Sequence, residues 1–168
     1  MINTDITRRH CRRAAVLAAG LAATLAMSGA ADAHATSHDR EIRSVLTNGA
    51  PGGEVVGKNR IHWPRQGVTL TLRASQQAPW MCESEYVCLY QDVNGEGRKI
   101  QFRDYGRYKL ARYGMGPGPR GVSSYYDNQI GATARSRLMR PNYRLPLRNF
   151  GNVPRSWNDR ATYVQLLP

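Results

Sequence analysis

Short runs in which apolar and polar residues alternate recur along most of the chain. In one of them Val68, Leu70 and Leu72 alternate with threonines, which is the period of two of a half-buried strand. By the same pattern, strands are predicted at residues 61–63, 68–72, 86–91, 98–102, 108–110, 123–127, 132–140, 145–147 and 162–167. Glycine and proline recur between the runs, and no segment keeps a helical period. The pattern predicts an all-β fold of many short strands.

The first 35 residues have the pattern of a signal peptide. Four arginines precede an apolar run at residues 14–27, and small-x-small sequences follow at 31–33 and 33–35. A run of about 14 residues is too short for a membrane span, which needs roughly 20. We therefore expect a secreted, extracellular protein without a membrane span, exported by the general or the twin-arginine route.

Residues 36–57 are polar and rich in glycine, which predicts a flexible N-terminal arm with at most one helical turn near residues 41–46. The patterned region then makes one domain, expected at residues 58–168.

Two cysteines, Cys82 and Cys88, follow the predicted leader, and Cys11 lies within it. An even number of cysteines in an exported chain favours a disulfide. A ring this short is expected to stabilise the fold by about 2–2.5 kcal/mol.

The chain is strongly basic, with a formal net charge of +12. Removing the leader, which carries four Arg and two Asp, lowers it to +10. Such a field attracts polyanions. The cations and tyrosines that could form a polyanion surface are Arg98, Lys99, Arg103, Arg107, Lys109 and Arg112 with Tyr105, Tyr108 and Tyr113. An acidic cell-wall polymer is one expected partner, and a solvated basic face without a ligand is the alternative.

No arrangement of residues indicates catalysis. His38 lies in the predicted arm and His62 in a strand, and the chain has neither a G-x-S-x-G elbow nor an H-E-x-x-H pair. Both mature cysteines are expected to be oxidised, and no carboxylate pair stands out for acid–base chemistry. We expect neither an enzyme nor a cofactor.

Residues 82–128 resemble the βγ-crystallin Greek-key motif and, more closely, the secreted metalloproteinase-inhibitor-like family of actinobacteria. The resemblance is carried by Cys82 and Cys88 around Tyr86-Val87, by Leu89-Tyr90, Gly97, Phe102, Leu110, Tyr113-Gly114 and Ser123-Ser124, and by the Trp157-Asn158-Asp159-Arg160-Ala161-Thr162 signal. It implies a small Greek-key sandwich with one disulfide. The second motif is degenerate in sequence, and Gly95 stands where the first motif usually has an aromatic residue.

The resemblance also implies structural roles for four residues. Gly97 suits a folded hairpin whose backbone conformation disfavours a Cβ. Ser123 and Ser124 are expected to bond backbone groups of that hairpin, and Tyr90 to cover it.

Motifs of this type can bind calcium through oxygen ligands. Pro119 and Arg120 occupy the corresponding positions of the first motif, whereas Asn158, Asp159 and Thr162 remain in the second. The sequence therefore predicts no metal site, and Asn158 and Asp159 are expected to close a turn, a residual calcium site being the alternative.

The expected function is inhibition of an extracellular protease by a monomer that presents a rigid surface loop. The candidate is the loop at residues 114–121, with Met115, Pro117, Pro119 and Arg120, because proline restricts φ. The turn at residues 83–85 is a second candidate surface. The alternatives are a polyanion-binding protein and a structural domain that acts by recruitment through its N-terminal arm.

Overall fold

The computed structural model describes residues 37–73, 80–130 and 136–168. The predicted leader and part of the predicted strand at 132–140 lie outside these residues. The elements are α1 (Ser37–Asn48), β1 (Glu54–Val55), β2 (Arg60–Trp63), η2 (Pro64–Gln66), β3 (Val68–Thr71), β4 (Val87–Tyr90), η3 (Val93–Gly95), β5 (Lys99–Phe102), β6 (Gly106–Lys109), η4 (Leu110–Tyr113), β7 (Ser124–Asp127), β8 (Arg137–Arg140), β9 (Tyr143–Pro146), β10 (Phe150–Asn152) and β11 (Tyr163–Leu166).

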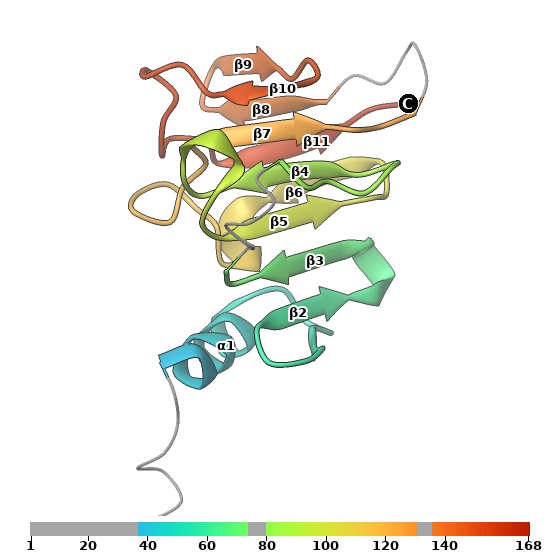
Figure 1. Ribbon diagram of the computed structural model, residues 1–168, viewed down its shortest axis with the longest axis vertical. Helices are drawn as coiled ribbons and strands as arrows, with labels where there is room; N and C mark the ends of the chain where they lie inside the picture. The colour runs from blue at the N-terminus through green and yellow to red at the C-terminus, as the bar shows by residue number, and fades with distance from the viewer. Residues whose placement is uncertain (1–36, 74–79, 131–135) are drawn as a thin grey trace, which may run out of the picture. The chain divides into compact units, whose positions relative to one another are not determined.

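The strands form two antiparallel sheets, which confirms the all-β sandwich. The first sheet has the order β1-β2-β3-β5-β4-β7-β10, and the second has the order β6-β11-β8-β9 (Figure 1). Apolar side chains of both sheets meet in one core cluster. Across the described residues, no helix has the length and apolar content that a membrane span requires.

The same connectivity occurs twice along the chain. In the first unit β5, β4 and β7 are neighbours in one sheet while β6 crosses to the other. In the second unit β9, β8 and β11 are neighbours while β10 crosses back. The second unit is therefore complete in topology, and its reduction lies in one turn: eight residues join β4 to β5, but only two join β8 to β9. Assignment to the crystallin type stays a prediction.

Strand β4 is buried on both faces. Val87 and Leu89 point into the core, and Cys88 and Tyr90 point to the opposite face. A strand that is covered on both faces has a continuous apolar sequence rather than an alternating one, and Val87–Tyr90 is such a sequence. The cover on the outer face is the segment that carries Cys82.

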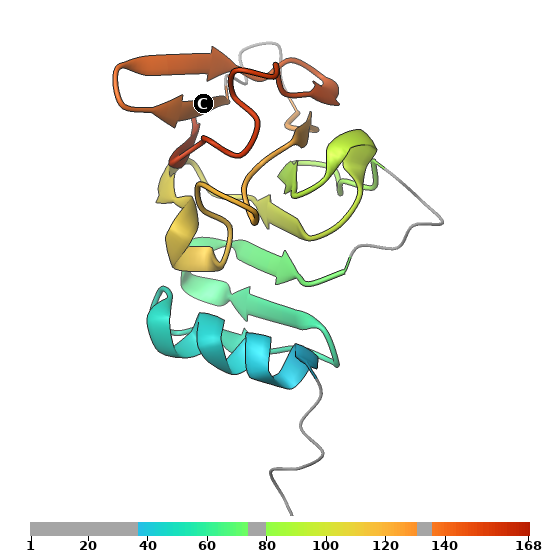
Figure 2. The same cartoon turned by 90° about the vertical axis from the view of Figure 1, so that its left-hand side faces the viewer.

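The N-terminal segment differs from the expected flexible arm. Residues 37–48 form helix α1, with Ile42 and Val45 buried, and β1 pairs with β2. The Nε1–H of Trp63 donates to Ala50 O at 2.9 Å. Figure 2 shows the helix lengthwise next to the β2–β3 hairpin. The expectation is wrong because Ile42, Val45 and Leu46 form a narrow apolar stripe that covers this end of the core.

Candidate functional site

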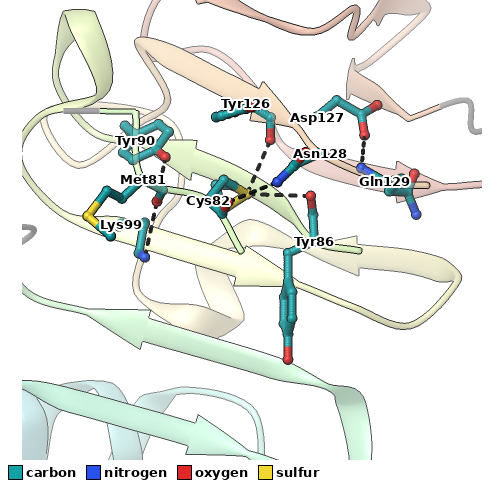
Figure 3. Close-up of a disulfide and its surroundings, with 10 residues drawn as sticks. Met81, Cys82, Tyr86, Tyr90, Lys99, Tyr126, Asp127, Asn128 and Gln129 are labelled. Carbon is teal, nitrogen blue, oxygen red and sulfur yellow. Dashed lines mark hydrogen bonds between the residues drawn. A yellow bond between two sulfur atoms is a disulfide. The ribbon is translucent and has the colours of Figure 1, made fainter. Parts of the chain in front are cut away.

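The disulfide between Cys82 and Cys88 is present, with a Cα–Cα distance of 5.7 Å (Figure 3). The Asn128 side chain donates to Cys82 O at 2.9 Å, and the Glu85 backbone N–H donates to Asn128 O at 2.9 Å. Cys82 Sγ also lies 3.4 Å from Tyr86 O, a packing contact because a disulfide sulfur has no proton to donate. The turn at residues 83–85 is thereby fastened to the end of β7.

Tyr90 anchors the residues that precede this disulfide. Its hydroxyl donates to Met81 O at 2.9 Å (Figure 3). Its ring meets the Trp80 ring edge-on, with 6.0 Å between the centroids. Burial raises the pKa of Tyr90 well above its usual value, with a smaller contribution from Tyr126. These contacts join Tyr90 to residues 80 and 81, in addition to the cover over the hairpin that the resemblance implies.

The turn between β4 and β5 has the features expected of a folded hairpin. Gly97 has φ +77°, and a Cβ there would lie 2.3 Å from an Asp92 carboxylate oxygen. Ser124 Oγ accepts from the Gly95 N–H at 3.0 Å and donates to Asp92 O at 2.6 Å. Ser123 contributes its backbone, which pairs with Tyr90 and Val153.

The motif usually has an aromatic residue at position 95, and the close approach of Trp80 explains why this chain has glycine there. A Cβ at residue 95 would lie 2.5 Å from the backbone nitrogen of Trp80. The Trp80 ring supplies an aromatic group at this place from another part of the chain. Its backbone has φ +67°, a region that non-glycine residues seldom adopt.

The loop at residues 114–121 is held at several points. The Met115 N–H donates to Leu110 O at 3.1 Å, the Gly118 N–H donates to Asp159 O at 2.9 Å, and Gln91 Nε2 donates to Pro119 O at 3.1 Å. Pro117, Pro119 and Arg120 are exposed. Met115, in contrast, is fully buried in the core, so its prediction as a contact residue is wrong. Its side chain anchors the loop.

A turn from the second unit supports this loop. Asp159 has φ +57°, and its N–H donates to Val122 O at 3.1 Å. A Cβ at Gly121 would lie 2.4 Å from Asp159 Cα, which shows how closely the two segments pack. Asn158 donates to the Asp159 carboxylate at 2.8 Å.

The remaining calcium candidate, Thr162, takes part in strand contacts. Its N–H donates to Met139 O at 2.8 Å, and its carbonyl accepts from the Leu110 N–H. Within the described ranges, no group of three or more His, Cys, Asp or Glu side chains could hold a metal ion.

Arg98 lies beneath the loop and does not belong to a surface. Its side chain is 4% exposed, its Nη1 donates to Gly114 O at 2.6 Å, and its Nη2 pairs with Glu41 of α1. Burial lowers the pKa of Arg98, and the Glu41 carboxylate partly offsets this. Arg120 Nη2 lies 3.6 Å from the same carboxylate. No sequence signal marks Glu41, because its partner is 57 positions away.

The predicted polyanion surface does not exist as one cluster. Tyr108 and Tyr113 are core residues that pack on Phe102, and Arg98 is buried. Lys99 and Lys109 belong to different sheets. Alternation places successive residues of a strand on opposite faces, so cations and tyrosines that are interleaved in sequence separate in the fold.

Residues 75–164 match the family model described as peptidase inhibitor family I36. The match covers more than half of the chain. The chain belongs to peptidase inhibitor family I36. Family I36 membership indicates an inhibitor-like, non-enzymatic protein whose partner is a peptidase, and such inhibitors are typically extracellular. No curated protein and no solved structure shows a significant match.

Proposed function

We propose that this protein inhibits an extracellular peptidase by presenting residues 116–120 to the enzyme's cleft. The observation that carries the proposal is a tip with Pro117, Pro119 and Arg120 exposed, while Met115 and the Gly118–Asp159 hydrogen bond hold its base. A loop that is already ordered loses less conformational entropy on binding. Family I36 membership supports the class of partner.

Arg120 is the only charged residue between positions 114 and 121. It is exposed, and its contact with Glu41 at 3.6 Å restricts a side chain that would otherwise be mobile. Arginine is common among the residues that dominate binding energy at interfaces. We therefore propose that Arg120 makes the main side-chain contact with the peptidase.

Inhibition should be measured by titrating the protein against a thermolysin-like metallopeptidase and a panel of serine peptidases. Gly118 has φ +106° and no atom within 4 Å of an added Cβ, so Gly118→Ala strains the tip without a steric clash. Gly52, with φ +78° and equally open space, provides a matched control as Gly52→Ala. We expect Gly118→Ala to weaken inhibition about tenfold, or about 1.4 kcal/mol, and Gly52→Ala to leave it unchanged. No inhibition at stoichiometric excess of the wild type would reject the function.

A second surface offers a distinct outcome of the same assay. Met81 and Phe150 are 62% and 57% exposed. The centroid of the Phe150 ring lies 5.2 Å from that of the Trp80 ring and 5.6 Å from that of the Tyr126 ring. This aromatic surface adjoins the disulfide, and exposed apolar patches often mark protein contacts. Inhibition that survives Gly118→Ala and Arg120→Ala but is lost in Met81→Ser and Phe150→Ser would move the contact here, and the loop assignment would be rejected.

A further inference from the structure

On the outer face of the second sheet, the charged residues of the strands are all basic. Residues such as Leu138 and Val164 point into the core, so the residues that alternate with them point outward. The outward-facing cations are Arg107, Lys109, Arg137 and Arg144, here called the basic face. Strands β6, β8, β9 and β11 contain no Asp or Glu. The face therefore attracts anions without a competing carboxylate on its own strands.

This face is open because the second unit has a short turn. In the first unit the hairpin between β4 and β5 bonds to Ser124, the first residue of β7. The equivalent first residue of β11 is Tyr163, and only Pro141 and Asn142 connect β8 to β9. A turn of two residues has no hairpin to fold back, so Tyr163 stays accessible at the edge of a groove.

The groove has a volume of about 620 Å³ and lies beside the basic face. Its lining includes Arg107, Arg140, Asn142, Tyr143, Arg144 and Tyr163. The Arg107 guanidinium lies 4.2 Å from the centroid of the Tyr163 ring. The Arg140 guanidinium lies 4.5 Å from the Tyr143 ring centroid and 4.7 Å from that of Trp157, and its Nη1 donates to Ser156 O at 2.8 Å. Two of the three arginines are therefore positioned before any ligand binds.

We propose that this groove and the basic face bind an anionic glycan. Arginine forks match carboxylate, sulfate and phosphate oxygens, and Asn142 and Tyr143 add neutral groups that can bond sugar hydroxyls. Single-stranded nucleic acid binds largely by stacking bases on open aromatic faces. Here guanidinium groups cover a face of both Tyr143 and Tyr163, which favours the glycan. None of the groove residues belongs to the loop at 114–121, so this binding is independent of peptidase inhibition.

Heparin, a sulfated glycan, is the probe. The test variant is Arg107→Ser with Arg144→Ser, and the charge-matched control is Arg40→Ser with Arg65→Ser, which removes exposed arginines from α1 and η2. We expect the test variant to bind heparin about tenfold more weakly at physiological salt, with the slope of log affinity against log salt reduced by about two. The control should bind as the wild type does. Because all four side chains are exposed, we expect both variants to melt at the temperature of the wild type, and this measurement verifies that they fold.

Two results would overturn the proposal. One is an equal loss of affinity in the test and control variants, which would show a delocalised effect of net charge. The other is a single-stranded oligonucleotide of the same total charge that binds as tightly as heparin. We expect the oligonucleotide to bind at least tenfold more weakly, a difference of about 1.4 kcal/mol.

Discussion

Replacing Glu41 by Gln tests whether α1 stabilises the base of the loop electrostatically. The substitution preserves size and removes one negative charge. The Arg98 guanidinium would then stay buried, with Nη1 on Gly114 O, without the one ionic partner that the described contacts give it and with a buried Nε that already lacks a hydrogen-bond partner there. Arg120, whose Nη2 lies 3.6 Å from the same carboxylate, would lose this partner as well.

The magnitude follows from burial. Removing one member of a fully buried ion pair destabilises a protein by about 3–5 kcal/mol. Because Glu41 keeps 22% of its side-chain surface exposed, water screens part of this loss, and we expect about 2–3 kcal/mol. In a domain of this size that corresponds to a decrease of the melting temperature of about 10 °C. The pKa of Arg98, which burial already lowers, should fall further.

The assay is urea unfolding of the wild type and of Glu41→Gln, with Glu85→Gln as the matched control. Glu85 pairs with Arg103 at 3.3 Å, but the two side chains are 55% and 58% exposed. An exposed pair contributes about 0–1 kcal/mol, so the control should unfold almost as the wild type does. Adding Arg98→Met to Glu41→Gln should recover part of the stability, because the uncompensated charge is gone. Equal effects of Glu41→Gln and Glu85→Gln would refute the reasoning.

Two further predictions concern the disulfide and the core. Replacing Cys82 and Cys88 by Ser should reduce the free energy of unfolding by about 2 kcal/mol through a gain of unfolded-chain entropy; thermal unfolding measures this, and an unchanged melting temperature would contradict it. Burial raises the pKa of Tyr108 to about 12 from 10.0. The protonated Tyr108 therefore contributes fully to the free energy of unfolding below pH 10, and this contribution is lost as the pH rises from 10 to about 12, by about 1.4 kcal/mol per pH unit. Tyr108→Phe removes the Tyr108 hydrogen bond to Asp104 O, but its free energy of unfolding should depend less steeply on pH in this range than that of the wild type. Equal slopes for the two proteins would exclude the effect.

The β-sheet elements could be predicted because their signal is local. Val68, Leu70 and Leu72 alternate with polar residues, and β3 begins at Val68 as predicted. Helix α1 could not be predicted in the same way. Its buried residues, Ile42 and Val45, lie among mostly polar neighbours, and a single spacing of three positions is too little to establish a helical period. Contact with the core, which the sequence does not display, stabilises the helix.

Much of the candidate site depends on contacts between distant parts of the chain. The glycines and prolines at 114–121 predict a loop, and these residues lie between η4 and β7 without regular secondary structure; their role in binding stays a prediction. The inward orientation of Met115 cannot be predicted from the sequence, because it depends on the backbone conformation of Gly114. Gly114 has φ +78°, and a Cβ there would have no room between Val45 and Leu70. The basic groove is not predicted for a related reason. It depends on the pairing of β6 and β8 with β11, which brings Arg107 and Tyr163 together, and on the pairing of β9 with β8.

The support of the loop extends beyond the region that matches family I36. That region is residues 75–164, but Glu41, Val45 and Leu70 precede it and lie against Arg98 or Gly114 at the base of the loop. A protein started at residue 58, where the domain was expected to begin, would lack α1 and leave the Arg98 guanidinium without the Glu41 carboxylate. It would also uncover Trp63, whose Nε1–H donates to Ala50 O. If the loop inhibits by being rigid, α1 is part of the inhibitory unit, because it supplies the charge that compensates the buried arginine beneath the loop.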